Sequence, residues 1–534
     1  MSKQSLPHQK RSSSKASAAS AAAHPPLTRA DRVLFYITAS ITGATVMMIE
    51  LLGTRIIGPY YGVSMIVWSS LLSTALLALS IGYMLGGRLA DTAPWLRLSH
   101  ILLVTAILIG VIPLISKPVQ LASNVLGLRG GALVSAFVLF TPCLLMLGMV
   151  GPYVIKIATS GLERVGRTAG TVYAISTLGS VLGTLFLGFF LLPLAGTEQI
   201  VIALSLLMLF MALLLALYEN RRLRARNSIV GWGATTGILA LVLLFGVGAG
   251  VGERNYSGSK VVFEQETHYG WVRVVDQPDR GIRWLMSGGS TIGAEDIRTG
   301  AGLLGYQKVV GYLPRFNPAG DEALLVGLGS GHLVNVYEQF GVRTDSIEID
   351  PAVAYAADRY FSFQPTGDVI VGDARYQIKQ LNKRYDFIIH DCFTGGAEPI
   401  HLLSLEMFQE LKAKLKPGGV LALNFVGLTL EGEEAPVEAV AHTLDQVFEH
   451  RRTFVSSPEA TFNDFVFYVS DEPLELQGSA DTLAWLTERE VTIEGDSELI
   501  ITDNFNPLET LHIAKAEYYR DMLIERVGEE ILFY

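Results

Sequence analysis

The chain has 534 residues, half of them apolar, and a formal net charge of −10 at pH 7. Only 17% of its residues are charged, well below the roughly 25% of an ordinary soluble domain. The acidic balance argues against a nucleic-acid partner, because binding to phosphates needs a basic face. Of the two cysteines, Cys143 lies in an apolar stretch, so a disulfide with Cys392 is not expected. The length allows two or three domains.

Residues 1–31 are rich in Ser, Ala, Lys and His and contain no apolar core. This composition predicts a disordered basic tail. The segment differs from a signal peptide, because the first apolar run begins late and is long enough to span a bilayer.

Residues 32–252 predict a transmembrane domain of about seven helices, because apolar stretches of bilayer length follow one another. The expected spans are Val33–Leu52, Val67–Leu85, Ile101–Ile115, Ala132–Ile155, Val172–Leu194, Ile200–Tyr218 and Val230–Val251. The N-terminal tail and every second loop are basic, whereas the alternate loops hold little positive charge. Positive charge marks the cytoplasmic side, so we expect the N-terminus in the cytoplasm.

Residues 253–318 predict a small antiparallel β-domain. Short runs rich in Val, Trp and Ile occupy residues 261–266, 271–275 and 282–286, and the last two flank a turn at Asp279–Gly281. Strands separated by such a turn are typical of a hairpin.

Residues 319–534 alternate between strand and helix patterns, which predicts a Rossmann-like α/β domain. A buried strand, residues 324–326, leads into a glycine turn, and the next strand ends at Glu348. Glycines let the backbone approach a nucleoside, and the acid that closes the second strand binds its ribose hydroxyls. The candidate residues of the turn are Gly327, Gly329, Ser330 and Gly331.

Two further carboxylates follow predicted strands, Asp373 (beside Ala374) after residues 369–371 and Asp391 after residues 387–389. Ligands bind at the carboxyl ends of strands in an open parallel sheet. We expect Asp373 to accept from an adenine amino group and Asp391 to face the reacting end. The turn lacks the third glycine of dinucleotide-binding sites, which favours an adenosyl-sulfonium ligand over a nicotinamide one. His390 is expected to point away from Asp391, and no metal-ligand spacing is visible.

This ordered set resembles the spermidine synthase family (polyamine aminopropyltransferases), and more closely the bacterial variants fused to a multi-span membrane domain. Tyr306-Gln307-Lys308 matches the family's Tyr-His/Gln-Glu segment, and residues 391–395 match its Asp-Ser-Ser/Thr-Asp-Pro catalytic loop. Residues 502–507 resemble a C-terminal segment of the fused members. The resemblance implies a multi-pass enzyme of the bacterial inner membrane, with a Rossmann-like S-adenosylmethionine-type transferase domain and a possible homodimer.

The resemblance also implies a reaction. An amine nitrogen attacks the aminopropyl carbon of decarboxylated S-adenosylmethionine, and putrescine, giving spermidine, is the family's usual acceptor. Asp391 would orient the amine and take its proton. Gln307 would contact the co-substrate, and Tyr306, Thr394 and Asp503 the acceptor. No metal is implied.

Three departures from the family pattern concern charge. The family's glycine turn carries an aspartate that holds the cationic amine of the decarboxylated co-substrate, and Ser330 replaces it. Thr394 replaces the second aspartate of the catalytic loop, and Lys308 replaces a glutamate. A polyamine cation favours several carboxylates, so putrescine as acceptor is poorly supported.

Two alternative functions therefore stay open, a methyltransferase that uses ordinary S-adenosylmethionine and a transporter whose second half senses a nucleoside. The side of the membrane on which the catalytic half lies is open as well. Seven crossings would place it outside, whereas adenosyl cofactors are made in the cytoplasm.

Overall fold

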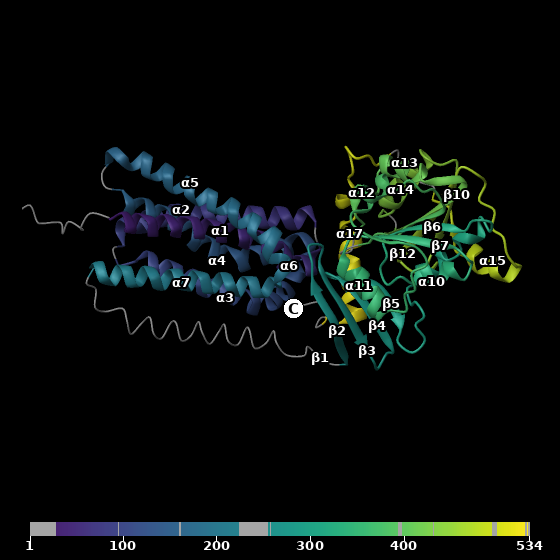
Figure 1. Ribbon diagram of the computed structural model, residues 1–534, viewed down its shortest axis with the longest axis horizontal. Helices are drawn as coiled ribbons and strands as arrows, with labels where there is room; N and C mark the ends of the chain where they lie inside the picture. Colours follow the sequence, from purple (N-terminus) through teal and green to yellow (C-terminus); the bar gives the residue numbers. More distant parts are fainter. Residues whose placement is uncertain are drawn as a thin grey trace, which may run out of the picture.

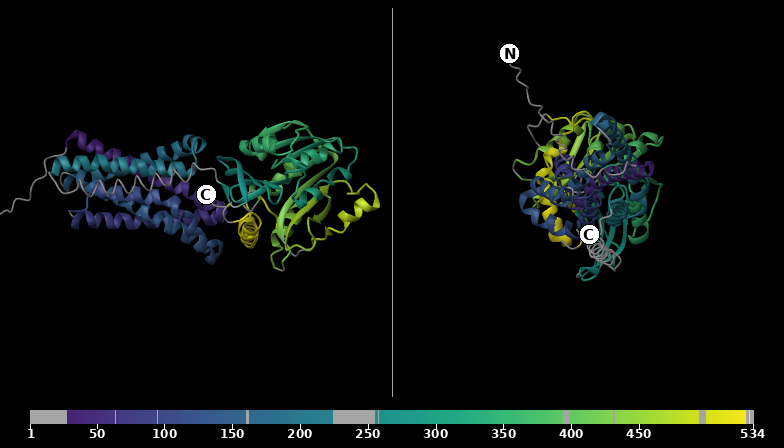
Figure 2. Two further views of the ribbon diagram at one scale, coloured as in Figure 1. Left: turned by 90° about the horizontal axis from the view of Figure 1, so that it is seen from below. Right: turned by 90° about the vertical axis from the view of Figure 1, so that its left-hand side faces the viewer.

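The computed structural model describes residues 28–62, 64–93, 95–159, 162–223, 255–256, 258–393, 398–430, 432–493, 499–528 and 531. A bundle of long helices occupies one side, and two β-sheets with their helices occupy the other (Figure 1). The bundle meets the rest of the molecule at one of its ends, as a perpendicular view also shows (Figure 2).

The long helices of the bundle are α1 (Arg29–Tyr61), α2 (Met65–Thr92), α3 (Leu98–Ser123), α4 (Gly127–Ala158), α5 (Val165–Phe186) and α7 (Thr197–Leu223). Short elements adjoin them: η1 (Asn124–Leu126), η2 (Leu162–Arg164), η3 (Leu187–Leu191) and α6 (Leu192–Leu194). Helix α1 begins at Arg29 because Thr28 and Asp31 form a capping box. Residues 29–31, which the sequence assigned to the tail, are therefore helical.

Within the part of the chain that the structure describes, five continuous helical stretches are long and apolar enough to cross a bilayer. The third, Leu98–Ala158, has 61 residues and contains both α3 and α4. These two helices form a hairpin, in which the hydroxyl oxygens of Ser123 and Ser135 lie 2.7 Å apart. Helices thus occupy each of the predicted spans except Val230–Val251, which lies outside the described residues.

The first sheet is an antiparallel meander in the order β1-β2-β3-β4-β5. Its strands are β1 (Asn255–Tyr256), β2 (Ser259–Glu266), β3 (Trp271–Gln277), β4 (Ile282–Ser287) and β5 (Ser290–Asp296). The sequence did not predict the last strand as a separate element. Only Gly288 and Gly289 separate it from β4. That spacing is typical of a tight hairpin loop.

The second sheet has eight strands in the order β13-β11-β12-β10-β9-β6-β7-β8. These are β6 (Glu322–Val326), β7 (Arg343–Glu348), β8 (Val369–Val371), β9 (Tyr385–His390), β10 (Leu415–Leu428), β11 (His450–Val455), β12 (Phe462–Ser470) and β13 (Glu490–Val491). Strands β6 to β10 are parallel, and β12 runs antiparallel to β10. The chain leaves β6 for β7 and β8, then returns to β9 on the other side of β6. This order confirms the Rossmann-like fold and places a ligand crevice beyond the ends of β6 and β9.

Residues 416–419 have the sequence Lys-Pro-Gly-Gly, a composition that ordinarily favours a turn. In the structure they belong to β10, whose pairing with β9 shifts register between Leu415 and Val420. The irregularity absorbs the Pro-Gly-Gly sequence without ending the strand.

Helices cover both faces of this sheet. They are α9 (Gly305–Val310), α10 (His332–Glu338), α11 (Pro351–Tyr360), α12 (Ala374–Gln380), α13 (Leu405–Lys412), α14 (Ala435–Asp445), α15 (Ala480–Thr487), α16 (Leu508–Leu511) and α17 (Ile513–Val527), with the short turns η4 (Leu313–Arg315) and η5 (Ile400–Leu402). Alternate residues of β6 enter opposite cores. Leu324 and Val326 pack with α12, α13 and α14, whereas Ala323 and Leu325 pack with α9 and α10.

Among the described residues, four sets of contacts join the bundle to the α/β half. Arg55 of α1 donates to the carbonyls of Thr267 and His268. The hydroxyl of Thr197 lies 2.6 Å from a carboxylate oxygen of Glu266. A Cβ at Gly289 would lie 1.8 Å from the carbonyl oxygen of Pro59, so only glycine fits there.

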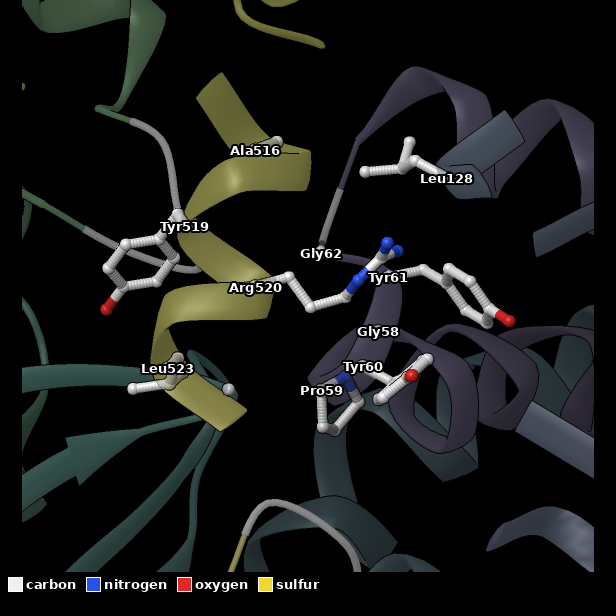
Figure 3. Close-up of a pocket in the computed structure, with 11 residues that line it drawn as sticks. Gly58, Pro59, Tyr60, Tyr61, Gly62, Leu128, Ala516, Tyr519, Arg520 and Leu523 are labelled. Carbon is white, nitrogen blue, oxygen red and sulfur yellow. The ribbon is translucent and has the colours of Figure 1, made fainter. Parts of the chain in front are cut away.

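The fourth set of contacts is made by α17, which lies between the bundle and the eight-stranded sheet (Figure 1). Glu517 accepts from the backbone N–H of Leu128 at 2.8 Å. The guanidinium of Arg520 lies 5.5 and 5.9 Å from the ring centres of Tyr60 and Tyr61. Figure 3 shows Arg520 extending from α17 toward these two tyrosines. Helix α17 therefore contacts both halves of the molecule.

A buried ion pair fixes α17 to the sheet, and its loss should destabilise the protein. Lys515 Nζ lies 2.6 Å from Glu398 Oε2, and both side chains are buried. We expect Lys515→Met to cost about 3–5 kcal/mol in the free energy of unfolding, because Glu398 would stay buried without its cation. Denaturant unfolding of the protein in detergent measures this loss.

The matched control is the double variant Glu398→Gln/Lys515→Met. It removes both charges while the side chain at 398 still accepts from Val426 N, as Glu398 does at 2.8 Å. It should recover most of the lost stability. A double variant as unstable as Lys515→Met would contradict the assignment of the loss to the unpaired charge.

Candidate active site

A cavity of about 600 Å³ lies at the carboxyl edge of the parallel strands. Its walls come from β4, β5, the ends of β6 to β9, strands β10 and β12, and one face of α17. It therefore occupies the crevice that the strand order indicates. Its volume is in the range of small-molecule sites, about 300–1,000 Å³.

The glycine turn forms one end of the cavity. Gly327 and Gly329 line it and have positive φ angles of 93° and 54°. A Cβ at Gly327 would lie 2.2 Å from the carbonyl oxygen of Asp391. Glycine at this position thus lets the ends of β6 and β9 meet.

Glu348 closes β7 beside this turn and lines the cavity. One carboxylate oxygen accepts from Leu328 N at 3.1 Å and the other from Asp350 N at 2.9 Å. Burial raises the pKa of Glu348 to about 7. The remaining lone pairs can accept from a vicinal diol such as the ribose of a nucleoside.

Asp373 and Ala374 line the same cavity beyond the end of β8. One oxygen of Asp373 caps α12 by accepting from Tyr376 N at 2.8 Å, and the other lies 3.5 Å from His401 Nε2. The side chain is half-exposed. This arrangement leaves it able to accept from an adenine amino group.

Asp391 lies at the end of β9, next to the glycine turn. Its oxygens accept from the hydroxyl of Tyr306 at 2.8 Å and from Asn424 Nδ2 at 3.0 Å. Burial raises the pKa of Asp391, although these two hydrogen bonds oppose the shift. A carboxylate with a raised pKa, held in orientation by two donors, suits a general base.

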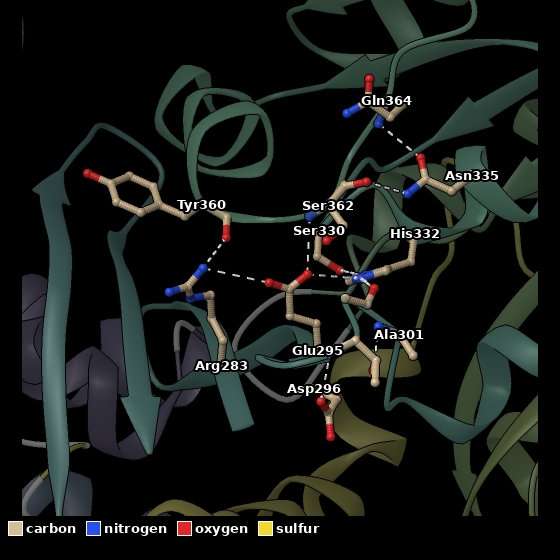
Figure 4. A network of polar contacts seen from close by, with 12 residues as sticks. Arg283, Glu295, Asp296, Ala301, Ser330, His332, Asn335, Tyr360, Ser362 and Gln364 are labelled. Carbon is tan, nitrogen blue, oxygen red and sulfur yellow. Dashed lines mark hydrogen bonds and ion pairs between the residues drawn. The ribbon is translucent and has the colours of Figure 1, made fainter. Parts of the chain in front are cut away.

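Ser330, Gly331 and Gln307 are placed differently from the prediction, since none of them lines the cavity. Ser330 is buried, and its Oγ lies 2.7 Å from His332 Nδ1. His332 in turn lies 3.3 Å from Glu295 of β5 (Figure 4). The serine therefore belongs to a polar network that joins the first sheet to α10.

Asp503 is also placed elsewhere. Its two carboxylate oxygens accept from Arg375 at 2.8 and 2.7 Å, and one of them also accepts from Ser404 Oγ at 2.6 Å. The prediction that Asp503 contacts the acceptor is not supported, because a bidentate ion pair holds it outside the cavity lining. Thr394 lies outside the described residues.

The neighbours of Asp391 differ in role. His390 is fully buried, and its Nε2 lies 3.0 Å from the carbonyl oxygen of Leu402, so it braces the loop before α13. Cys392 lines the cavity, but burial raises the pKa of its thiol well above the ordinary value. The thiol is therefore a poor nucleophile.

The sequence prediction missed several residues of the cavity, namely Asn424, Ser456, Phe462, Asp464, Tyr519, Met522 and Arg526. Asn424 and Asp464 are polar residues in mainly apolar strands, a pattern that could have singled them out. The residues of α17 carry no comparable signal in the sequence.

Nucleoside affinity should depend on pH through Glu348. Above its pKa of about 7 the side chain is a carboxylate that accepts from both ribose hydroxyls, and below it protonation removes part of that capacity. We expect the affinity for S-adenosylhomocysteine to fall by up to about tenfold per pH unit below this value. Calorimetric titrations between about pH 6 and pH 8 test this.

The control is Glu348→Gln, which should bind roughly 10- to 100-fold more weakly and show no such pH dependence. An unchanged affinity of the wild-type protein across the range would contradict the role given to Glu348.

Comparison with known proteins adds to this geometry. Residues 356–424 match a family model described as S-adenosyl-L-methionine-dependent methyltransferase. An N-terminal histidine N-methyltransferase of Emericella nidulans is 31% identical over 193 residues, which cover 32% of this chain and 34% of that protein.

Two aminopropyltransferases are also similar. The polyamine aminopropyltransferase of Vibrio vulnificus is 40% identical over 116 residues, covering 20% of this chain and 39% of that protein. The probable polyamine aminopropyl transferase of Bifidobacterium longum is 24% identical over 283 residues, covering 47% and 62%. The matches thus span from about a third to less than two thirds of these relatives. The two aminopropyltransferase matches confirm that the chain resembles the polyamine aminopropyltransferases, or spermidine synthases.

Proposed function

We propose that the chain is a transferase that moves an aminopropyl group from decarboxylated S-adenosylmethionine to an amine. The position of Asp391 carries the proposal. It directly follows β9 beside the glycine turn after β6, and it lines the cavity together with residues of β10, β12 and α17. Tyr306 and Asn424 hold it in one orientation.

The chemistry follows from this placement. A neutral amine nitrogen attacks the aminopropyl carbon beside the sulfonium, a carbon–nitrogen bond forms, and the carbon–sulfur electron pair leaves with 5′-methylthioadenosine. The excess proton on the nitrogen passes to Asp391. The raised pKa of Asp391 makes it a stronger base than an exposed aspartate.

Methyl transfer to nitrogen from ordinary S-adenosylmethionine is the second candidate. The methyltransferase model matches residues 356–424, which include Asp373 and Asp391. Ser330 removes the negative charge that would disfavour the carboxylate of ordinary S-adenosylmethionine. Asp391 would have the same role in both reactions, but the carbon attacked and the nucleoside released would differ.

The released nucleoside distinguishes the two reactions. The purified protein is given each co-substrate form separately with putrescine and other amines, and the nucleoside product is identified by mass spectrometry. We expect 5′-methylthioadenosine from the decarboxylated form. Asp391→Asn should lower the rate by about 10²–10⁴-fold, with nucleoside affinity unchanged.

S-adenosylhomocysteine from ordinary S-adenosylmethionine, with no 5′-methylthioadenosine, would replace the first proposal by the second. An Asp391→Asn protein as active as the wild type would exclude the role of Asp391 in either reaction.

We also propose that the helical bundle spans a bilayer, as in a bacterial inner membrane. Its outer helices expose large apolar side chains, such as Leu76, Leu178, Leu182, Phe189 and Phe210, each more than half exposed. A surface of this kind is unfavourable in water, whereas the hydrocarbon core of a membrane accommodates it.

The distribution of charge favours one orientation of the bundle. The end at which α1 begins carries Arg29, Arg32, Arg88, Arg97, Lys156, Arg164, Arg167 and Arg221, whereas the other end carries Arg55, Lys117 and Arg129. The contacts to the α/β half, from Arg55, Leu128 and Thr197, are all at the second end. Because positive charge stays in the cytoplasm, we propose that the catalytic half lies on the outer side.

Cysteine accessibility in intact cells tests this orientation. In a chain without Cys143 and Cys392, Asp368→Cys places a thiol on the catalytic half, where the aspartate is 79% exposed. Asp91→Cys places one at the basic end, where the aspartate is 75% exposed. We expect a membrane-impermeant maleimide to label the first in intact cells and the second only after permeabilisation. The reverse pattern would place the catalytic half in the cytoplasm.

A further inference from the structure

A second, smaller cavity lies where the end of the bundle meets α17. Its volume is about 30 Å³, room for roughly two water-sized groups. The last turn of α1, the first turn of α4, Gly289 of the β4–β5 hairpin and one face of α17 form its walls. Tyr519 of α17 lines both this cavity and the larger one, so the helix lies between them.

Arg520 of α17 faces the small cavity with a guanidinium that is buried and poorly satisfied. Its side chain is 10% exposed, and Figure 3 shows it reaching from α17 toward the space beside Leu128 and Tyr61. Among the described residues, its Nε and Nη1 are both buried without a hydrogen-bond partner. The other described arginines with a buried unpartnered nitrogen, Arg273, Arg375 and Arg489, each have one such atom.

The carboxylates near Arg520 do not bind it closely. Within the described part of the chain, its one ion pair is with Asp521, whose carboxylate oxygen lies 3.7 Å from Nε and whose side chain is 68% exposed. That separation is too long for a hydrogen bond. Glu517, one turn earlier on α17, directs a carboxylate oxygen to Leu128 N at 2.8 Å. Because an arginine cannot lose its proton, its burial here is unfavourable until an anion contacts it.

The surroundings of the guanidinium suit an oxyanion that carries an apolar part. The rings of Tyr60 and Tyr61 contact it as cation–π partners, and such rings do not replace a hydrogen-bond acceptor. The N–H groups of a guanidinium form a planar fork that matches two oxygens of a phosphate. Leu128, Ala516 and Leu523 supply apolar wall.

The place of the cavity indicates where such a phosphate comes from. It lies at the last turn of α1 and the first turn of α4, and the headgroup region of a bilayer lies at the ends of the helices that cross it. Lys117 and Arg129 are at the same end of the bundle, and basic residues near a membrane surface attract anionic lipids. A phospholipid headgroup therefore fits this position better than free phosphate.

We propose that Arg520 and the cavity around it bind a phosphate group, supplied by the headgroup of a phospholipid. The inference goes beyond the proposed transferase activity, because the site lies on the other face of α17 from the larger cavity. The lipid as the source of the phosphate rests on the proposal that the bundle spans a bilayer.

The test measures binding to the full chain in detergent, without an amine or an adenosyl nucleoside. Three ligands are titrated calorimetrically at constant ionic strength: dihexanoyl phosphatidylglycerol, dihexanoylglycerol, which lacks the phosphate, and inorganic phosphate. We expect saturable binding of the phospholipid and none of dihexanoylglycerol. Arg520→Gln should weaken phospholipid binding by about 10- to 100-fold.

Four further variants sharpen the test. Ala516→Leu keeps Arg520 but narrows the cavity, and it should also weaken binding, so the result does not depend on the folding of Arg520→Gln. Arg520→Lys keeps the charge without the planar fork and should retain part of the affinity. Arg129→Gln removes an exposed cation beside Leu128, and Arg526→Gln removes an arginine of α17 that lines the larger cavity. Both should bind as the wild type does.

The outcomes separate the site from its source and from the proposed function. Loss of phospholipid binding in Arg520→Gln and Ala516→Leu supports the inference, whichever nucleoside the transferase assay releases. Binding of inorganic phosphate alone, lost in the same two variants, keeps the phosphate site and refutes the lipid as its ligand. The inference is overturned if the wild-type protein binds neither phosphate compound, if Arg520→Gln binds as tightly as the wild type, or if Arg129→Gln weakens binding equally.

Discussion

The close approach of two strand ends is the constraint on which the site depends. Gly327 ends β6 against the carbonyl of Asp391, so closely that a Cβ would lie 2.2 Å from that oxygen. This packing fixes Asp391 beside the glycine turn that leads toward Glu348. The backbone geometry of these two strand ends therefore sets how close Asp391 lies to the glycine turn.

The bundle is connected to the nucleoside end through a short chain of contacts. Arg55 of α1 holds the carbonyl of Thr267, and the hydroxyl of Thr267 donates to Asp350 at 2.6 Å. The N–H of Asp350 donates to Glu348. Helix α17 makes a second connection, because it contacts α1 and α4 with one face and lines the cavity with the other. The bundle is thus connected to the walls of the cavity by two sets of contacts.

The chain is similar to aminopropyltransferases and to an N-methyltransferase, whose reactions are chemically related. In each reaction an amine nitrogen attacks a carbon bonded to the sulfonium sulfur and displaces a thioether. An oriented carboxylate can take the proton from the nitrogen. What separates them is the charge around the reacting carbon and at the far end of the acceptor.

The sequence determined the nucleoside end of the site because its residues follow strands directly. Gly327, Glu348, Asp373 and Asp391 could be placed from local pattern, since parallel strands bring their carboxyl ends to one edge. The tertiary structure alone decided which side chains turn toward the cavity. His332 holds Ser330 and Arg375 holds Asp503 away from it, while antiparallel pairing of β12 and the packing of α17 bring Asp464 and Tyr519 into it. Most of these partners are distant in sequence, as Arg375 and Asp503 are at 128 residues apart, so local pattern gives at most a partial signal, such as the polar Asp464 in a mainly apolar strand.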